Sequence, residues 1–202
     1  MQNMPTLLAK LGKTGIVRVG KLVFNTKGTI MKFVAGDKVV VPAHGVGTII
    51  GIEPFLGEDM HVVYFTRQQL TCRIPVRKVG AVRALSTPQQ LYSALSELTK
   101  TRYKSRRLWS QRKVGYYRDL HSGDIRTLCV LARNLFATDD ERMHDKQSYT
   151  ERTIFEDAYN RIVEEVTVAA GIDHVRVAAF VDEALATKKL PREFTVLRTG
   201  RT

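Results

Sequence analysis

Trp109 is the only tryptophan of the chain, and it lies in a strongly basic segment, residues 101–113. This segment holds six Lys and Arg side chains and no acidic one. Lys and Arg neutralise phosphate charges and release counterions, while a large flat ring can stack on a base or enter a base step. The two kinds of residue in one short segment favour nucleic-acid binding.

The alternative role for Trp109 is that of a core anchor, which is the usual place of a single tryptophan. Its neighbours argue against that role, because a buried indole would draw several charges toward the core. These neighbours are Arg106, Arg107, Arg112 and Lys113. We therefore expect a half-exposed ring on a charged surface.

The positive charge is concentrated in parts of the chain. The 202 residues carry a formal net charge of +12. Residues 1–30 and 87–125 each carry +5, whereas residues 126–190 carry −3. This distribution favours one surface that faces a polyanion over a uniformly basic protein.

Sites for other chemistry are weakly supported. Cys72 and Cys129 are isolated thiols, the five histidines are scattered, and none of them has the spacing of a zinc site. Motifs of serine hydrolases and of nucleotide-binding glycine loops do not occur. The sequence therefore predicts no enzyme, no metal, no cofactor and no small-molecule substrate. No apolar run approaches the roughly 20 residues that cross a bilayer, so no membrane partner is expected.

Two further motifs have simpler structural explanations. The run from His44 to Gly47 could cradle a phosphate, but a hairpin turn with glycines at positive φ explains it better. Glu164 and Glu165 could bind a metal or act as acid and base, and we expect a solvated helix face instead.

Residues 33–85 have the alternation and the β-branched residues of short strands. Strands are predicted over residues 37–42, 47–53, 60–66 and 70–75, with a fifth near 81–85. Turn residues at 42–47 and 54–59 separate them. Short antiparallel strands in so few residues predict a small, strongly bent barrel.

After Pro88 the apolar period becomes helical. A basic helix is expected from about residue 106 to residue 120, closed by Gly123 in the left-handed conformation. Ser148 and Glu151 have the spacing of a capping box at the start of a long helix. Further helix boundaries are predicted at Asp124, Gly171 and Asp173. The predicted fold class is α+β, with a small antiparallel β-barrel followed by an all-α domain.

These patterns divide the chain into four regions. Residues 1–31 form a basic leader that we expect to be disordered, and residues 32–86 form the β domain. Residues 87–190 form the helical domain, and residues 191–202 form a flexible basic tail. The leader could be read as a transit presequence, but a flexible arm or an over-extended start is the preferred interpretation.

Four blocks of sequence carry a family resemblance. They are Gly-Asp-x-Val-Val-x-Pro-x-His-Gly-Val-Gly at 36–47, Arg-Ile-Pro at 73–75, Leu-Trp-Ser-Gln-Arg at 108–112, and Ser-Gly-Asp at 122–124. In this order they resemble the CarD/CdnL family of bacterial transcription regulators. The resemblance covers roughly residues 32–187.

The resemblance implies a Tudor-like module that binds the RNA polymerase β subunit and a helical module that contacts promoter DNA. It implies that Trp109 approaches the minor groove at the upstream edge of the melted region and helps to hold the bubble open. Arg112 and Lys113 would then contact the DNA backbone, with Arg106 and Arg107 on the same surface. Arg73 is the residue implied for the polymerase contact.

One departure from the family concerns the polymerase interface. Pro54, Phe55 and Leu56 stand where relatives often place a further basic contact, so a more apolar interface is expected. A wedge that recognises DNA shape would have low sequence specificity and a modest, salt-sensitive affinity. The expected location is the bacterial cytoplasm, at the nucleoid through polymerase.

Two other functions remain open from the sequence. An RNA-binding or ribosome-associated protein would use residues 101–113 on folded RNA. A protein-interaction adaptor would use the barrel alone, with Trp109 as a core residue.

Overall fold

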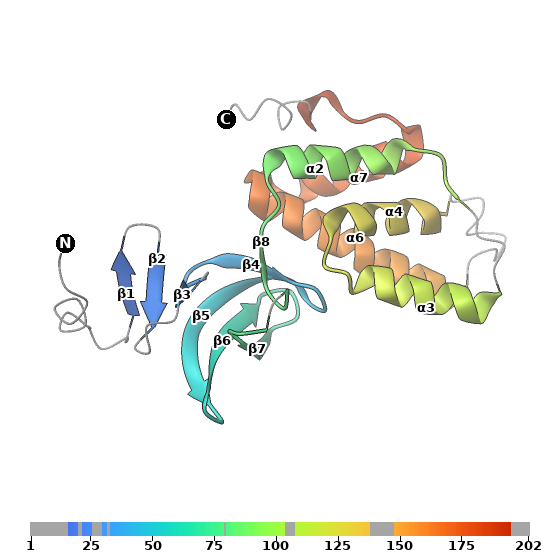
Figure 1. Ribbon diagram of the computed structural model, residues 1–202. Coiled ribbons are helices and arrows are strands. Elements are labelled where there is room, and N and C mark those ends of the chain that lie inside the picture. Colours follow the sequence, from blue (N-terminus) through green and yellow to red (C-terminus); the bar gives the residue numbers. More distant parts are fainter. Residues whose placement is uncertain are drawn as a thin grey trace. The chain divides into compact units, whose positions relative to one another are not determined.

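The computed structural model describes residues 33–78, 80–103, 108–137 and 148–194, and the backbone of three short strands before residue 32. The chain forms two compact units (Figure 1). The first comprises the chain up to Val39 together with Gly47–Ala81, and the second comprises Val40–Val46 together with the chain from Val82 onward. The short segment Val40–Val46 therefore groups with the helices.

The leader contains the strands β1 (Ile16–Val19), β2 (Leu22–Asn25) and β3 (Ile30–Met31). They form an antiparallel sheet in the order β1-β2-β3, and Val19 pairs with Leu22 across two intervening residues. At these strand residues the structure differs from the disorder expected for residues 1–31. The cause is local, because these short runs are rich in β-branched and apolar residues, which suit strands. The other leader residues lie outside the described part of the chain.

The central sheet has five strands in the order β7-β6-β5-β4-β8. They are β4 (Lys38–Val41), β5 (Gly45–Phe55), β6 (Glu58–Phe65), β7 (Leu70–Pro75) and β8 (Arg83–Ala84). β5 pairs antiparallel with β6, and β6 with β7. All five correspond to predicted strands, but β5 and β6 continue through most of the turn predicted at 54–59.

The core of the first unit includes side chains of β4, β5 and β6. Val39, Ile49, Val63 and Phe65 are fully buried. Gly47 has a spatial role, because a Cβ atom there would lie 2.5 Å from Cγ1 of Val63. Gly45 has φ +87°, as a turn glycine should. The two glycines of the candidate phosphate cradle are thus explained by packing and by the turn.

The second unit is helical. Its elements are α2 (Pro88–Leu95), the 3-10 helix η1 (Ser96–Thr99), α3 (Trp109–Leu120), α4 (Ile125–Leu135), α6 (Tyr149–Ala170), α7 (His174–Thr187) and the 3-10 helix η2 (Arg192–Phe194). The predicted caps are confirmed at Asp124, Ser148 with Glu151, Gly171 and Asp173. With the antiparallel sheet, this bundle confirms the α+β class.

α4 lies at the centre of the bundle and contacts α2, α3 and α6 (Figure 1). Its apolar side chains Leu128, Cys129 and Leu131 pack into a core to which α2, α6 and α7 also contribute. Burial raises the pKa of the Cys129 thiol, so this cysteine stays protonated. Among the described helices none is long and apolar enough to cross a membrane.

Glu165 corrects the expectation of a solvated acidic pair. Its side chain is 2% exposed, and both carboxylate oxygens accept hydrogen bonds of 2.8 Å from the guanidinium of Arg83. Ser86 adds bonds from its backbone N–H and its hydroxyl. A buried carboxylate needs such partners, because an unpaired charge in the core is costly.

The start of the predicted flexible tail is packed. Phe194 is 1% exposed, and its ring lies edge-on to Phe180 with the centroids 5.0 Å apart. Pro191 is also buried. The structure therefore differs from the expected tail at residues 191–194, because an aromatic side chain finds a place in the core there. Residues 195–202 lie outside the described part.

Candidate nucleic-acid interface

α3 is the helix that carries the predicted DNA-binding residues, and it is largely exposed. Of its twelve residues, all of them described, Leu120 alone is buried. Val114 is 72% exposed, and Leu108, directly before the helix, is also 72% exposed. A helix with this little burial leaves most of its surface free for a partner.

One stripe of α3 faces the bundle. Trp109, Arg112, Tyr116 and Leu120 follow one another at spacings of three and four residues, which places them on one side of a helix. Leu120 belongs to the core and Tyr116 packs against it. Burial, and then the carboxylate of Glu151, raise the pKa of Tyr116. Trp109 is the outermost member of this stripe.

Trp109 is 38% exposed. Its ring is covered by the guanidinium of Arg112, whose Cζ atom lies 5.6 Å from the ring centroid. The indole is thus neither a core anchor nor a free surface side chain. A ring that a guanidinium covers and that keeps part of its surface exposed suits a contact with a base or a base step.

Arg112 is half-buried and connects α3 with α6. Its Nη2 atom lies 3.8 Å from Oε1 of Glu151, and the two side chains are 30% and 15% exposed. Its Nε atom is buried and has no hydrogen-bond partner among the described residues. Arg112 is therefore held by charge and by the indole, and less available to a DNA backbone than the sequence suggested.

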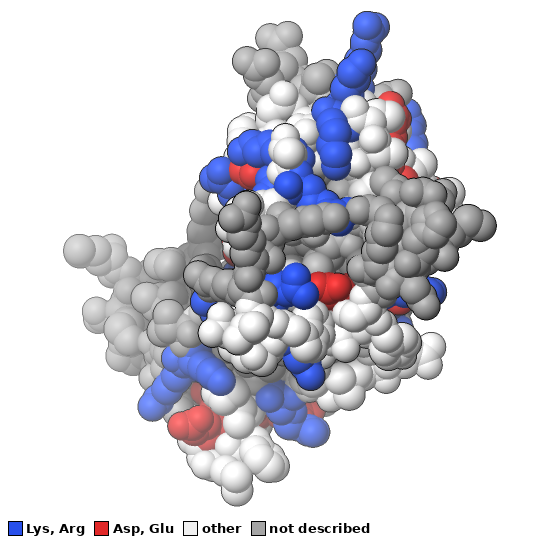
Figure 2. All heavy atoms as spheres, turned by 90° about the vertical axis from the view of Figure 1, so that its right-hand side faces the viewer, with Lys and Arg blue, Asp and Glu red and all other residues white. Residues whose placement is uncertain are grey.

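The first turn of α3, which is described throughout, contains no acidic residue, and Leu108 makes no side-chain cap there. Its main-chain N–H groups carry the partial positive charge of a helix start. Lys113 is exposed one turn later. Arg106 and Arg107 lie outside the described residues. In the view toward the start of α3, Lys and Arg side chains are more widespread than Asp and Glu (Figure 2).

The other end of α3 is held by Arg161 of α6. Its Nη1 atom donates to the carbonyl oxygens of Leu120 and Pro42, both at 2.8 Å, and its Nη2 atom donates to that of Ala43 at 2.9 Å. Gly123, with φ +72°, follows closely and has no room for a side chain beside Pro42. A cation at the end of a helix also interacts favourably with the helix dipole.

Arg73, the predicted polymerase contact, lies on β7 at one edge of the sheet. Its guanidinium pairs with Oε2 of Glu53 at 3.1 Å, and the two side chains are 54% and 52% exposed. Exposed pairs of this kind contribute only about 0–1 kcal/mol. Arg73 can therefore exchange Glu53 for a partner's acid at little cost.

The hairpin between β5 and β6 presents apolar side chains close to this pair. Phe55 is 49% exposed and Leu56 is 89% exposed. Phe55 lies two residues beyond Glu53 and thus on the same sheet face. Leu56 has φ +50° and Gly57 has φ +83°, so the turn has positive φ at both central residues. Leucine is a poor choice for that conformation, where asparagine is favoured.

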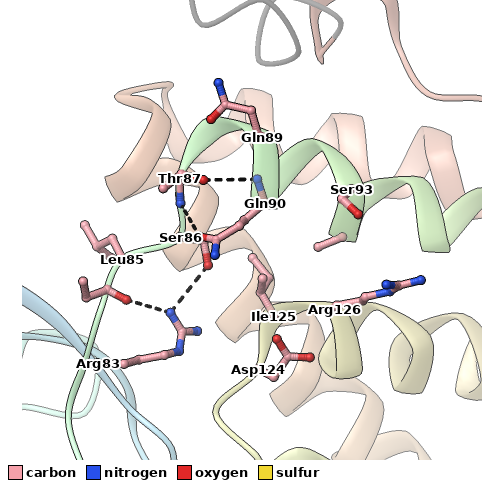
Figure 3. Close-up of a pocket in the computed structure, with 12 residues that line it drawn as sticks. Arg83, Leu85, Ser86, Thr87, Gln89, Gln90, Ser93, Asp124, Ile125 and Arg126 are labelled. Carbon is pink, nitrogen blue, oxygen red and sulfur yellow. Dashed lines mark hydrogen bonds between the residues drawn. The ribbon is translucent and has the colours of Figure 1, made fainter.

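A cavity of about 660 Å³ lies between α2 and the start of α4 (Figure 3). Its polar lining already serves the fold. Thr87 and Gln90 form the capping box of α2, Asp124 caps α4, Arg83 binds Glu165, and Arg126 binds Glu97. These contacts fix the path of the chain into α2, and they leave the cavity without a set of free polar groups aimed at a ligand among the described residues.

Sites for metal chemistry are also lacking in the part of the chain that the structure describes. No group of three His, Cys, Asp or Glu side chains there could hold a metal ion. His61 is buried in the first unit, and burial lowers the pKa of its imidazole. The features that stand out are the exposed helix and the exposed hairpin.

Comparison with known protein families matches both units. Residues 33–86 match the CarD-like/TRCF RID domain, and residues 93–182 match the CarD C-terminal domain. The chain belongs to the CarD family. Family members are non-enzymatic transcription regulators that interact with RNA polymerase, and the RID domain is Tudor-like. The family resemblance and the Tudor-like fold predicted from the sequence are thus confirmed.

Sequence reasoning missed two buried charged residues of α6 and the link from Glu151 to α3. Arg161 and Glu165 were not singled out as buried, although they share the apolar stripe of α6 with Ile154, Ala158 and Ile162. Glu151 was recognised only as a helix cap. Its contact with Arg112 joins residues far apart in the sequence, which a local pattern does not reveal.

The exposure of Trp109 predicts a mild effect of its removal on stability. Trp109→Ala should lower the free energy of unfolding by about 1–2 kcal/mol, because the ring is only partly buried. Leu120→Ala on the same helix should cost about 2–5 kcal/mol, as for a core leucine. Denaturant unfolding measures both. A loss for Trp109→Ala as large as that for Leu120→Ala would make Trp109 a core residue.

Proposed function

We propose that this protein binds the RNA polymerase β subunit through its first unit and stabilises the open promoter complex by a minor-groove contact from Trp109. The observation that carries the proposal is the half-exposed indole at the start of an exposed, acid-free helix turn. The family match supports the polymerase partner in general terms.

The indole supplies the wedge of this mechanism. A large ring that enters a partly unstacked base step replaces lost stacking and widens the minor groove. Such a contact is more favourable with DNA at the edge of a melted region than with an intact duplex. A factor that binds the open state more tightly shifts the population toward it by its differential affinity. About 1.4 kcal/mol of differential contact is worth a factor of ten.

The surroundings of Trp109 supply phosphate contacts. Lys113 is exposed and lies one turn from the indole, and Leu108 at the N-cap makes no side-chain hydrogen bond to the first N–H groups of α3. These groups attract a phosphate without reading bases. We include Arg106 and Arg107 in this surface by their place in the sequence. Arg112 contributes through the indole that it covers more than through a phosphate.

Low sequence specificity follows from this chemistry. The proposed contact uses ring stacking, positive charge and DNA shape, so it reads few base edges. Affinity for free DNA should be modest and salt-sensitive. Binding to polymerase then raises the effective concentration of α3 at the promoter. The proposed location is accordingly the bacterial cytoplasm, at transcribed DNA.

For the polymerase face we propose Arg73 together with the hairpin tip. Arg73 offers a guanidinium that suits a carboxylate of the partner. Phe55 and Leu56 add exposed apolar area close to Glu53, the partner of Arg73. Charge then steers the encounter, and apolar contact slows dissociation.

Open-complex lifetime on a promoter tests the two contacts together. The protein should lengthen the lifetime about tenfold, and Trp109→Ala and Arg73→Glu should each remove most of that gain. Trp109→Ala should still bind polymerase, whereas Arg73→Glu should not. Arg67→Glu, the same charge change in the turn between β6 and β7, is the matched control. No effect of the unsubstituted protein on lifetime would refute the proposal and leave RNA binding to be tested.

Leu56→Asn distinguishes the effect of this residue on stability from its effect on polymerase binding. Asparagine before glycine is favoured in this turn, so the substitution should raise the free energy of unfolding by up to about 1 kcal/mol. Affinity for polymerase should nevertheless fall about threefold to tenfold, because an apolar contact is lost. Denaturant unfolding and biolayer interferometry measure the two effects. Unchanged affinity would exclude Leu56 from the interface.

A further inference from the structure

The indole of Trp109 is supported by a chain of contacts that begins on α6. Arg112 covers the ring at 5.6 Å, and Glu151 lies 3.8 Å from the guanidinium of Arg112. These residues come from two helices, and the contacts among them lie on the bundle side of α3. The order of the chain is carboxylate, guanidinium, indole.

Glu151 is itself fixed in position. Its Oε2 atom accepts hydrogen bonds from the backbone N–H of Ser148 at 3.4 Å and from the Ser148 hydroxyl at 3.3 Å. Its own backbone N–H donates to the Ser148 hydroxyl at 3.2 Å. The capping box leaves Oε1 to face Arg112. A side chain that is 15% exposed and bound in this way has little freedom.

Arg112 depends on this carboxylate for its placement. Long arginine side chains lose considerable rotamer freedom when they are fixed, so something must hold the guanidinium over the ring. In the described residues its Nε atom has no acceptor, and Glu151 is the acid paired with its Nη2 atom. Without that charge the guanidinium gains more by turning to solvent.

We infer that Glu151 is a positioning residue for Trp109, which acts through Arg112 and orients the indole for its contact with DNA. This inference rests on the proposed function of Trp109. It assigns to the N-terminal capping box of α6 a second role besides capping the start of that helix. It also explains an acidic side chain beside a surface that should attract phosphate, where simple electrostatics would favour a neutral one.

Glu151→Gln tests the inference without breaking the helix cap. Glutamine serves in a capping box as glutamate does, so α6 should remain intact, while the charge that holds Arg112 is lost. Glu156→Gln is the matched control. Glu156 makes an exposed ion pair with Arg152 at 2.9 Å on the same helix, and its substitution changes the net charge equally.

Fluorescence gives the first readout, because Trp109 is the only tryptophan of the chain. In the protein alone, Glu151→Gln should lower the fluorescence anisotropy and raise the acrylamide quenching constant by about 1.5-fold to twofold. Glu156→Gln should leave both unchanged. In an Arg112→Met background, Glu151→Gln should add nothing, since it acts through Arg112. Unchanged fluorescence of Glu151→Gln would overturn the inference.

Open-complex lifetime gives the second readout. Glu151→Gln should reduce the gain in open-complex lifetime by a factor of about two to five, although the substitution makes the surface more positive. Polymerase affinity should not change. If Glu151→Gln lengthened the lifetime as much as Glu156→Gln does, Glu151 would act only by repelling phosphate. That result would overturn the inference. If fluorescence responds as expected but the unsubstituted protein has no effect on lifetime, Glu151 does position the indole of Trp109, and the proposed function is wrong.

Discussion

α6 holds α3 at both ends, and the exposed position of α3 depends on this attachment. At the start of α3 the link is Glu151 to Arg112, and at its end it is Arg161 to the carbonyl oxygen of Leu120. Apolar burial cannot do this alone, because Leu120 is the one fully buried side chain among the twelve described residues of the helix. A helix that offers its surface to a partner must be placed by polar contacts, which are specific in geometry and weak one by one.

The proposed interfaces share a second property, which is that they are not optimised for stability. Leu56 occupies a left-handed turn position that asparagine fills at lower cost, and it exposes 89% of its surface. Trp109 lies at the end of the stripe of α3 that faces the bundle, and it is 38% exposed. Residues of this kind are typical of binding surfaces, where the lost stability is recovered on contact with the partner.

The sequence predicted well whatever depends on neighbouring residues. Asp124, Ser148 and Asp173 were recognised as helix caps, because capping needs partners two or three residues away. The predicted boundaries of β7, residues 70 and 75, are the observed ones. Contacts between residues far apart in the sequence were missed. Glu165, for example, was expected to face solvent, but it is buried and paired with Arg83. Trp109 was expected to be half-exposed and is so, but the burial of Arg112 was not foreseen, because its partner Glu151 lies on another helix.

The central claim is that the indole of Trp109 touches promoter DNA in the polymerase complex. A photo-crosslinking amino acid at position 109, in an open complex with labelled promoter strands, tests it directly. We expect crosslinks to DNA at the upstream edge of the melted region, formed only when polymerase is present. The same probe at Tyr149, an exposed aromatic at the start of α6, serves as a control for unspecific crosslinking. Crosslinks from position 109 to polymerase alone, or to no partner at all, would contradict it.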